Sequence, residues 1–240
     1  MAWKETDLKR SYVCNREMLK FFRERKGWSQ QQLCDQSGVS VRVVSKGEAG
    51  NPISNGSIDK LATAFSIPEY VVYPEDLISR PTELAKQFVT ALYSEQKNFL
   101  NSVGEIIDAD AIFRVVGDPK KIPFAGVHRG PRAYRRAVKK FFQIFEIEEG
   151  LDHAASYEYF PKGTEVVLWG TSRMELIGSE LPPTDVSFRK RFRFRRGLLY
   201  SFEDHHDISQ SERKVARAVR FQGSRVFDSV DDSSLGTEKE

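Results

Sequence analysis

A short stretch that begins at Ser29 constrains the fold of this chain more than any other part of the sequence. Ser29 is a good helix N-cap, because its hydroxyl can accept a bond from a free amide of the first helical turn. Gln32 lies three residues later and can reach back to the amide of Ser29, which completes a capping box. Gly38 allows the backbone to turn sharply, and Ser40 can then cap a second helix. The stretch therefore predicts two short helices joined by a tight turn, with the second helix over residues 41–48.

A helix, a glycine turn and a capped helix form the arrangement whose second helix enters the major groove of DNA. The stretch resembles the Cro/repressor-type (XRE-like) helix-turn-helix family. The residues that match the family pattern in register are Gly27, Ser29, Gln30, Leu33, Gly38, Val39, Ser40, Val44, Glu48 and Gly50. Cys34 replaces a small alanine, and Gly47 replaces a large apolar residue. Since glycine costs roughly 1 kcal/mol relative to alanine in a helix, Gly47 weakens the end of the second helix. The alternative is an ordinary helical hairpin.

The resemblance implies which side chains meet DNA. By position these are Gln30, Val41, Arg42 and Lys46, with Ser40 and Ser45 near the phosphates. Arginine can bond a guanine edge through two donors, glutamine can bond adenine or a phosphate, and valine can contact a thymine methyl. Lys46 is expected to contact a phosphate, which positions the helix without reading sequence. Val39 and Val44 are expected to face the core.

At 240 residues the chain is long enough for two domains of ordinary size. It carries 37 lysine and arginine residues against 34 aspartate and glutamate residues, a formal charge of +3. This small excess excludes a protein that holds nucleic acid by bulk charge alone. DNA binding would therefore rest on the placement of a few side chains. One small module also favours a homodimer that reads a two-fold related site on double-stranded DNA.

What the sequence lacks excludes several kinds of protein and site. No apolar run approaches the ~20 residues of a membrane span, and the first residues lack the apolar core of a signal peptide, so we expect a cytoplasmic protein with no membrane partner. Cys14 and Cys34 are expected to be buried small apolar residues rather than a disulfide. We expect no cofactor and no metal. The run Asp204–Asp207 could suggest a metal site, but neighbours on a strand alternate faces and cannot converge on one ion.

The chain is expected to divide at residues 79–81, because proline disfavours helix in the residue before it and can open the next helix. The expected parts are a flexible N-terminus over 1–12, an all-α helix-turn-helix domain over 13–79, a second domain over 81–209, and a short helix with a disordered tail over 210–240. Within the first domain, a helix is expected over 13–26, a loop over 51–56, and a helix capped by Ser57.

The second domain is expected to be α+β, because helices precede a run of strands. Helices are expected over 82–99, 102–107 and 131–145, and strands over 111–116, 154–160, 165–175, 186–196 and 198–207. The proline- and glycine-rich segment 117–130 is expected to be a loop. A short amphipathic helix is expected over 211–221.

Residues 123–131, the aromatic pair Phe141-Phe142 and the strands over 192–207 carry a second resemblance, to the NTF2-like, SnoaL-like family. It covers about residues 81–209. The resemblance implies a cystatin-like fold, in which a curved antiparallel sheet forms a cone and helices cover its mouth. It also implies pairing of two copies through the outer face of the sheet.

Some NTF2-like proteins are enzymes, and the ketosteroid isomerase type needs a carboxylate base and two hydrogen-bond donors. Asp118 lies where that family's base is found, but Phe88 stands at the tyrosine position and Lys190 near the third position. Only one of the three groups is present. Asp118 is therefore either a turn residue or an isolated base, and no catalytic residue is assigned.

The cone implied by the resemblance could hold an apolar small molecule. The candidate pocket residues are Arg114, Asp118, Phe124, His128, Tyr157, Trp169, Phe192 and Glu203. The alternative is that the aromatic residues simply fill the core. Arginines at the odd positions from 189 to 195 would share one strand face, which suits an anionic partner or plain exposure to solvent.

Together these patterns predict a dimeric, sequence-specific DNA-binding transcriptional regulator. Its NTF2-like domain would dimerise and sense a small apolar ligand. The alternative is an NTF2-like isomerase or hydrolase with an accessory DNA-binding module. An adaptor whose second domain binds only protein is a third hypothesis.

Overall fold

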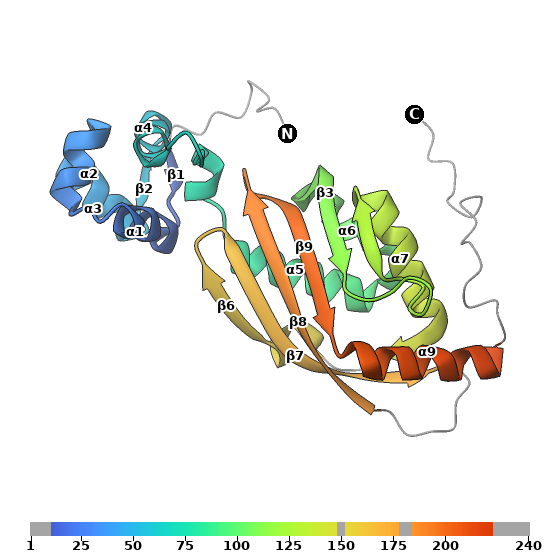
Figure 1. Cartoon of the computed structure of the whole chain (residues 1–240). Helices are drawn as coiled ribbons and strands as arrows, with labels where there is room; N and C mark the ends of the chain where they lie inside the picture. Colours follow the sequence, from blue (N-terminus) through green and yellow to red (C-terminus); the bar gives the residue numbers. More distant parts are fainter. Residues whose placement is uncertain (1–10, 148–151, 178–183, 223–240) are drawn as a thin grey trace. The chain divides into compact units, whose positions relative to one another are not determined.

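The computed structural model describes residues 11–147, 152–177 and 184–222 (Figure 1). The predicted flexible N-terminus up to residue 10 and the predicted disordered tail after residue 222 lie outside these ranges. The chain forms two compact units. The first contains the residues up to Glu83 together with Pro161–Val166 and Arg193–Leu198, and the second contains the remainder. The sequence placed the division at residues 79–81 and did not anticipate the two later segments.

The first unit contains the predicted helix-turn-helix pair. Its elements are β1 (Ser11–Val13), α1 (Arg16–Arg25), α2 (Gln30–Ser37), α3 (Val41–Glu48), β2 (Pro52–Ser54), α4 (Asn55–Phe65) and the 3₁₀ helix η1 (Pro74–Leu77). The capping box of α2 is present, since Ser29 Oγ accepts from the amide of Gln32 and Gln32 Oε1 accepts from the amide of Ser29. Gly38 has a left-handed backbone with φ of 68°, which a residue with a Cβ adopts only at a cost.

Two boundaries in the first unit differ from the sequence prediction. The first helix begins at Arg16 rather than residue 13, because the Asn15 side chain caps it and the preceding residues pair as β1 with β2. The fourth helix begins at Asn55, because the Ser54 hydroxyl accepts from the amide of Ser57. The predicted loop at 51–56 thus contains a strand, and the domain is not strictly all-α.

The core of the first unit is built from one face of each helix. Its buried members include Met18, Leu19 and Phe22 of α1, Leu33 of α2, Val44 of α3, and Ile58, Leu61 and Phe65 of α4. Cys14 and Cys34 are both buried, as predicted, and are not joined in a disulfide, although Cys14 precedes α1 rather than lying within it. The buried carboxylate of Asp76 in η1 accepts from the amides of Tyr73 and Arg196, which ties the segment 193–198 into this unit.

The second unit has the predicted α+β architecture. Its helices are α5 (Pro81–Ser94), η2 (Gln96–Asn98), α6 (Leu100–Val103), η3 (Gly104–Ile106), α7 (Pro131–Ile144), α8 (His153–Ser156) and α9 (Ile208–Gln222). The strands of its sheet, apart from their ends within Pro161–Val166 and Arg193–Leu198, belong to the second unit. They are β3 (Ile107–Val115), β4 (Gly126–Arg129), β5 (Phe145–Ile147), β6 (Glu158–Lys162), β7 (Glu165–Leu176), β8 (Thr184–Arg195) and β9 (Leu198–His206).

The strands form one mixed seven-stranded sheet in the order β4-β3-β9-β8-β7-β5, with β6 also paired to β7 (Figure 1). β3 and β9 are parallel, with Phe113 opposite Phe202, so the sheet is not wholly antiparallel as expected. Two short strands, β4 and β5, were not predicted. β4 lies in the predicted loop and pairs with β3, which shows that its structure depends on a partner distant in the chain.

Helices α5 and α7 pack on the sheet through aromatic side chains. Phe88 of α5 contacts Phe192 and Phe202, with ring centroids 5.7 and 5.3 Å apart. Tyr134 of α7 stacks on Phe113 of β3 at 4.3 Å. These contacts are the core of the second unit. No helix among the described residues is long and apolar enough to cross a membrane.

Candidate nucleic-acid interface and ligand cavity

Helix α3 divides cleanly into a buried face and an exposed face. Val44 is fully buried and Val39 nearly so, as predicted, whereas Val41 is 42% exposed. The other predicted contact residues of this segment, Ser40, Arg42, Ser45 and Lys46, are also exposed. Ser40 is the N-cap residue of α3, but its hydroxyl makes no capping bond. The exposed face therefore carries two basic side chains, two hydroxyl groups and a valine. Such groups can contact the base edges and the phosphates of a DNA groove.

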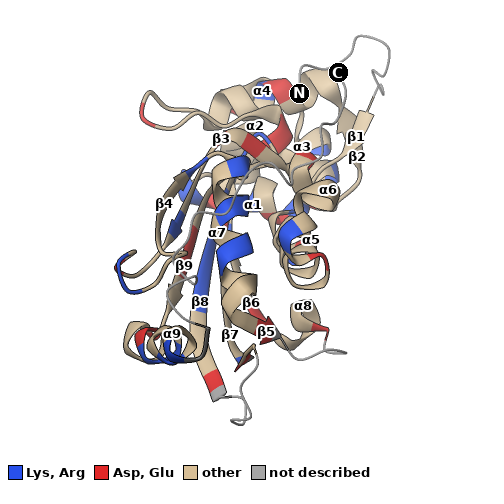
Figure 2. Cartoon of the chain, turned by 90° about the vertical axis from the view of Figure 1, so that its right-hand side faces the viewer, with Lys and Arg blue, Asp and Glu red and all other residues tan. Residues whose placement is uncertain are grey.

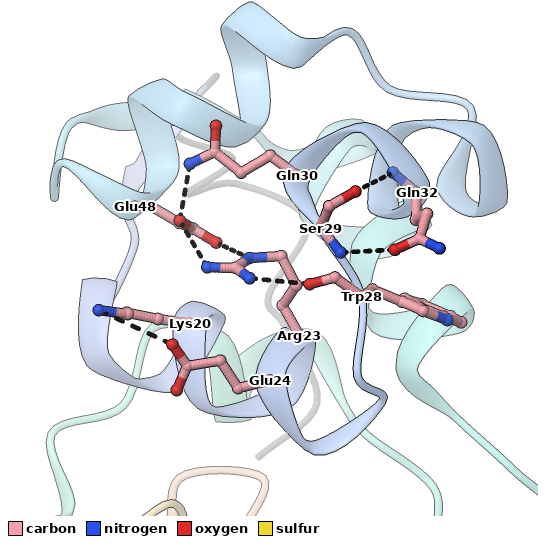
Figure 3. A network of polar contacts seen from close by, with 8 residues as sticks. All are labelled: Lys20, Arg23, Glu24, Trp28, Ser29, Gln30, Gln32 and Glu48. Atoms are coloured by element: carbon pink, nitrogen blue, oxygen red, sulfur yellow. Dashed lines mark hydrogen bonds and ion pairs between the residues drawn. The ribbon is translucent and has the colours of Figure 1, made fainter.

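A charged clamp joins α1, α2 and α3 (Figure 3). Arg23 of α1 donates from Nε to Glu48 Oε1 at 2.5 Å and from Nη2 to Glu48 Oε2 at 3.2 Å. Gln30 of α2 donates to Glu48 Oε2 at 2.8 Å, and Arg23 also donates to the carbonyl of Trp28. Burial acts to raise the pKa of Glu48, but the bonds from Arg23 and Gln30 and the charge of Arg23 outweigh it and lower the pKa. The clamp fixes the end of α3 against the other two helices.

The clamp gives Gln30 a role that the sequence prediction missed. Its side chain is half-buried, and one amide hydrogen is used by Glu48. An amide nitrogen carries two hydrogens, so a bond to a phosphate is compatible with the clamp. Its contact with DNA stays a prediction.

Gly47, the residue that departs from the family pattern, lies at the contact between α3 and α1. A Cβ built at this position would lie 2.7 Å from Cδ2 of Leu19, which is fully buried. The helix nevertheless continues through Gly47 to Glu48. Glycine is present because the two helices approach too closely for a side chain.

A cavity of about 60 Å³ lies within the second unit, between the sheet and α5, α7 and α9. Its apolar wall includes Leu92, Phe124, Val138, Phe141, Phe145 and Phe188. Its polar groups include Tyr93, Tyr134, Lys190, Asp204, His206 and Lys214. An apolar concavity with a few converging polar groups is the form that small-molecule sites take.

The polar groups of the sheet come from two strands. Asp204 and His206 are two residues apart on β9, so both side chains point to the same face as the buried Phe202. Lys190 of β8 donates to Asp204 Oδ2 at 2.5 Å. The second carboxylate oxygen, Asp204 Oδ1, and His206 Nε2 are buried and make no hydrogen bond within the described structure. Burial lowers the pKa of His206 and raises the pKa of Tyr134, so both are neutral at pH 7.

Comparison with known families decides the character of the first unit. Residues 19–71 match the Helix-turn-helix family model. Residues 19–71 form a DNA-binding helix-turn-helix domain. The matched segment contains α2 and α3 and the complete clamp, and it agrees with the XRE-type resemblance of the sequence.

No curated protein matches the sequence. Similar solved structures include an NTF2-like protein from Burkholderia xenovorans, with 19% identity and a TM-score of 0.45 over 57% of this chain and 94% of that one. A protein with a cystatin-like fold from Xanthomonas campestris has 18% identity and a TM-score of 0.44, over 57% of this chain and 97% of that one. A putative isomerase from Rhodopseudomonas palustris has 13% identity and a TM-score of 0.46, over 58% and 97%.

Of the eight predicted pocket residues, only Phe124 lines the cavity of the second unit. Phe192 is fully buried among the core aromatics, and Tyr157 packs edge-on against Phe188. Trp169 is 60% exposed, which places it outside the core altogether. The aromatic residues had been grouped without knowledge of which sheet face each would occupy.

The polar residues predicted for the pocket do not line this cavity either. Arg114 and Asp118 are exposed, and His128 bonds to the carbonyl of Phe124. Glu203 contacts His205, which lies two residues away on its own strand. Asp118 accepts from the amide of Lys120 and so holds a turn. The turn role, one of the two alternatives left open by the sequence, is the one that the structure supports.

The arginine strand behaves as its alternation predicts. In β8 the odd positions Arg189 and Arg195 are exposed, whereas Phe188, Phe192 and Phe194 are buried. Figure 2 shows lysine and arginine residues, coloured blue, along this strand. Arg193 forms an ion pair with Glu165, with 3.5 Å between Nε and Oε2. An acidic group of the same chain therefore already contacts one of the arginines on this strand face.

Sequence reasoning missed the residues that give the cavity its polarity. It considered the run 204–207 only as a metal site and rejected it because neighbours alternate. The same alternation, applied to positions two apart, indicates that Asp204 and His206 share a face. Lys190 was considered only as the residue near the third position of the ketosteroid isomerase pattern, although a lysine on the buried face of a strand calls for an acidic partner.

Proposed function

We propose that this helix-turn-helix protein is a sequence-specific transcriptional regulator that acts as a dimer and whose second unit binds a small ligand. The observation that carries the proposal is the exposed face of α3, with Arg42 and Lys46 outward and Val44 inward. A side chain that is exposed on a rigid helix can reach base edges without rearrangement of the domain. The family match of residues 19–71 supports the same conclusion.

Dimerisation is proposed because one module offers a small footprint on DNA. Two exposed aromatic residues provide a surface for it, since Phe160 of β6 is 52% exposed and Trp169 of β7 is 60% exposed. Both line one shallow surface groove with Arg173 and Asp185. Large aromatic residues with a polar surround are typical of protein–protein contacts. We therefore place the contact between copies on this outer face of the sheet.

Ligand binding is proposed because the cavity of the second unit is apolar and contains buried polar atoms without partners. Such atoms are rare in folded proteins, since each costs about 1–3 kcal/mol when left unpaired. An occupant that satisfies them would stabilise the second unit. The enzyme alternative placed its base at Asp118, and the turn bond of that residue in an exposed loop gives it no support.

The DNA-binding proposal is tested by selection of DNA sites from a random pool with the full-length protein at two salt concentrations. We expect a two-fold symmetric site. We expect Arg42→Ala to cost about 1–3 kcal/mol on that site and to relax preference at one base pair of each half-site, with little change on random DNA. Lys60→Ala, which removes an exposed cation from α4, is the matched control. Equal losses on selected and random DNA would contradict the role of Arg42.

The variant Lys46→Ala distinguishes a phosphate contact, which positions the helix on DNA, from a base contact, which reads the DNA sequence. Because a phosphate contact carries no sequence information, we expect the same fractional loss of affinity on selected and random DNA. The slope of log affinity against log salt should also decrease by about 1. Fluorescence anisotropy over a salt series measures both quantities. A loss confined to the selected site would show that Lys46 reads bases instead.

A further inference from the structure

The cavity of the second unit has a polar end whose hydrogen-bonding groups are incompletely used. Asp204 Oδ2 is bonded to Lys190, but Asp204 Oδ1 is buried without a partner. His206 Nε2, on the same face of β9, is also buried without a partner. Both residues line the cavity, and its remaining wall is mainly apolar, with several aromatic side chains. We infer that the cavity binds a neutral, largely apolar alcohol or phenol, whose hydroxyl group satisfies Asp204 and His206. This inference rests on the proposed ligand-binding function and specifies the class of ligand.

The hydroxyl group follows from the donors and acceptors available. A carboxylate oxygen only accepts hydrogen bonds, so the ligand must donate to Asp204 Oδ1. A neutral imidazole nitrogen either donates or accepts. A hydroxyl has one hydrogen and two lone pairs, so it can donate to the carboxylate and still accept from an imidazole N–H. A carbonyl or ether lacks the hydrogen that Asp204 requires.

The neutrality of the ligand follows from the charges that face the cavity. The charge of Asp204 is balanced by Lys190, whose Nζ lies 2.5 Å from Asp204 Oδ2. Lys214 of α9 also lines the cavity, and burial lowers its pKa. A cationic amine would lie close to two lysines, and an anionic ligand would meet the carboxylate of Asp204. A neutral ligand avoids both costs, because an unpaired charge in an apolar site is strongly disfavoured.

The size of the cavity limits the ligand. Its volume is about 60 Å³, which is smaller than the ~150 Å³ cavity that holds benzene in an engineered protein. A single ring can enter only if side chains of the wall move. Phe141 and Phe142 of α7 line the cavity and are half-buried, so they are the side chains best able to make room. The ligand is thus small, with about one ring or its aliphatic equivalent.

The inference is tested by titrating the full-length protein with phenol and with toluene, which replaces the hydroxyl by a methyl group of similar size. Chemical shifts in protein-observed NMR spectra give both affinities. We expect phenol to bind at least ~10-fold more tightly, since a hydrogen bond to a charged group is worth about this much. Benzylamine and benzoate should bind more weakly than phenol. Tighter binding of toluene, benzylamine or benzoate than of phenol, or no binding of phenol, would overturn the inference.

Variants locate the effect in the cavity. Asp204→Asn should reduce the preference for phenol over toluene to about twofold or less, whereas Asp110→Asn, an equal charge change at an exposed residue, should retain it. If Asp204→Asn fails to fold, His206→Phe leaves the ion pair intact and should also reduce the preference. An unchanged preference in His206→Phe and Asp204→Asn would overturn the assignment of the hydroxyl site.

The outcomes also separate this inference from the proposed function. Equal binding of phenol and toluene, with shifts confined to cavity residues, would retain a ligand-binding second unit but refute the hydroxyl class. If neither phenol nor toluene binds, both the hydroxyl-ligand inference and the proposed ligand-binding function of the second unit are overturned. Neither outcome affects the DNA selection experiment, which depends on α3.

Discussion

Gly47 shows how one residue of the first unit is chosen by tertiary contact rather than by helix propensity. It lies within α3, where alanine would ordinarily be preferred by roughly 1 kcal/mol. The nearest neighbour of an added Cβ is Leu19 Cδ2 at 2.7 Å, and Leu19 is enclosed by the core. The close approach of α1 and α3 therefore outweighs the gain in propensity.

We predict that Gly47→Ala destabilises the first unit by about 1–3 kcal/mol, because the added Cβ would force the fully buried Leu19 side chain to shift. Gly56→Ala is the matched control, since Gly56 lies in α4 with no atom within 4 Å of an added Cβ. That change should stabilise the unit by up to about 1 kcal/mol. Hydrogen exchange of the α1 and α3 amides in the full chain measures both. Stabilisation by Gly47→Ala would show that the helices can separate at little cost.

The helices of the first unit act together through the clamp of Arg23, Gln30 and Glu48. The side chains of Arg23 and Glu48 are only 13% and 11% exposed, so their charges are partly removed from water. Removing one partner from such a pair leaves the other buried and uncompensated. The clamp thus couples the position of α3 to the positions of α1 and α2. Within α1 and α2, Gln30 is the residue that is predicted to contact DNA.

We predict that Glu48→Gln destabilises the first unit by about 3 kcal/mol at pH 7. The pKa of Glu48 is lowered from its ordinary value of 4.5, so its stabilising effect is complete above pH 4.5 and is lost as the pH falls through the folded-state pKa. The difference between wild type and Glu48→Gln should therefore shrink below about pH 4.5. Glu69→Gln, an exposed acid, is the control. Urea denaturation of the first unit over a pH series measures this; a constant difference across the range would contradict the clamp's charge dependence.

The whole molecule is expected to function as a pair of chains. The exposed residues Phe160 and Trp169 lie in one surface groove of the second unit. A tryptophan at the centre of a contact commonly contributes about 2 kcal/mol or more to binding. Such a contact would allow two α3 helices to engage the two halves of one site, and the affinity for the full site would then depend on association.

We predict that Trp169→Ala raises the dissociation constant of the dimer at least ~10-fold. Val127→Ala, a change at a residue of β4 that is 47% exposed, should leave association unchanged. Sedimentation velocity over a concentration series measures the dimer, and anisotropy on half and full sites measures its effect on DNA. A dimer that survives Trp169→Ala intact would place the contact elsewhere on the chain.

Local sequence signals were sufficient for the elements that the chain forms without distant partners. The capping box at Ser29, the turn at Gly38 and the inward face of Val44 were all predicted, because each depends on residues within one or two helical turns. The second unit's main helices and long strands were also predicted from periodicity. The short strands β1, β2, β4 and β5 were missed, because three or four residues carry little periodicity and gain stability only from a neighbouring strand.

The sequence by itself determined the helix-turn-helix pair, the α+β class of the second unit and the outward position of Arg42 and Lys46. Only the tertiary structure decided that Asp204 and His206, rather than Asp118, face a cavity, and that Gly47 serves helix contact. The physical reason is distance along the chain. A cap or a helical face is set by residues a few positions apart, whereas a cavity is formed where strands and helices separated by a hundred residues meet, and their packing alone determines which polar atoms are left without partners.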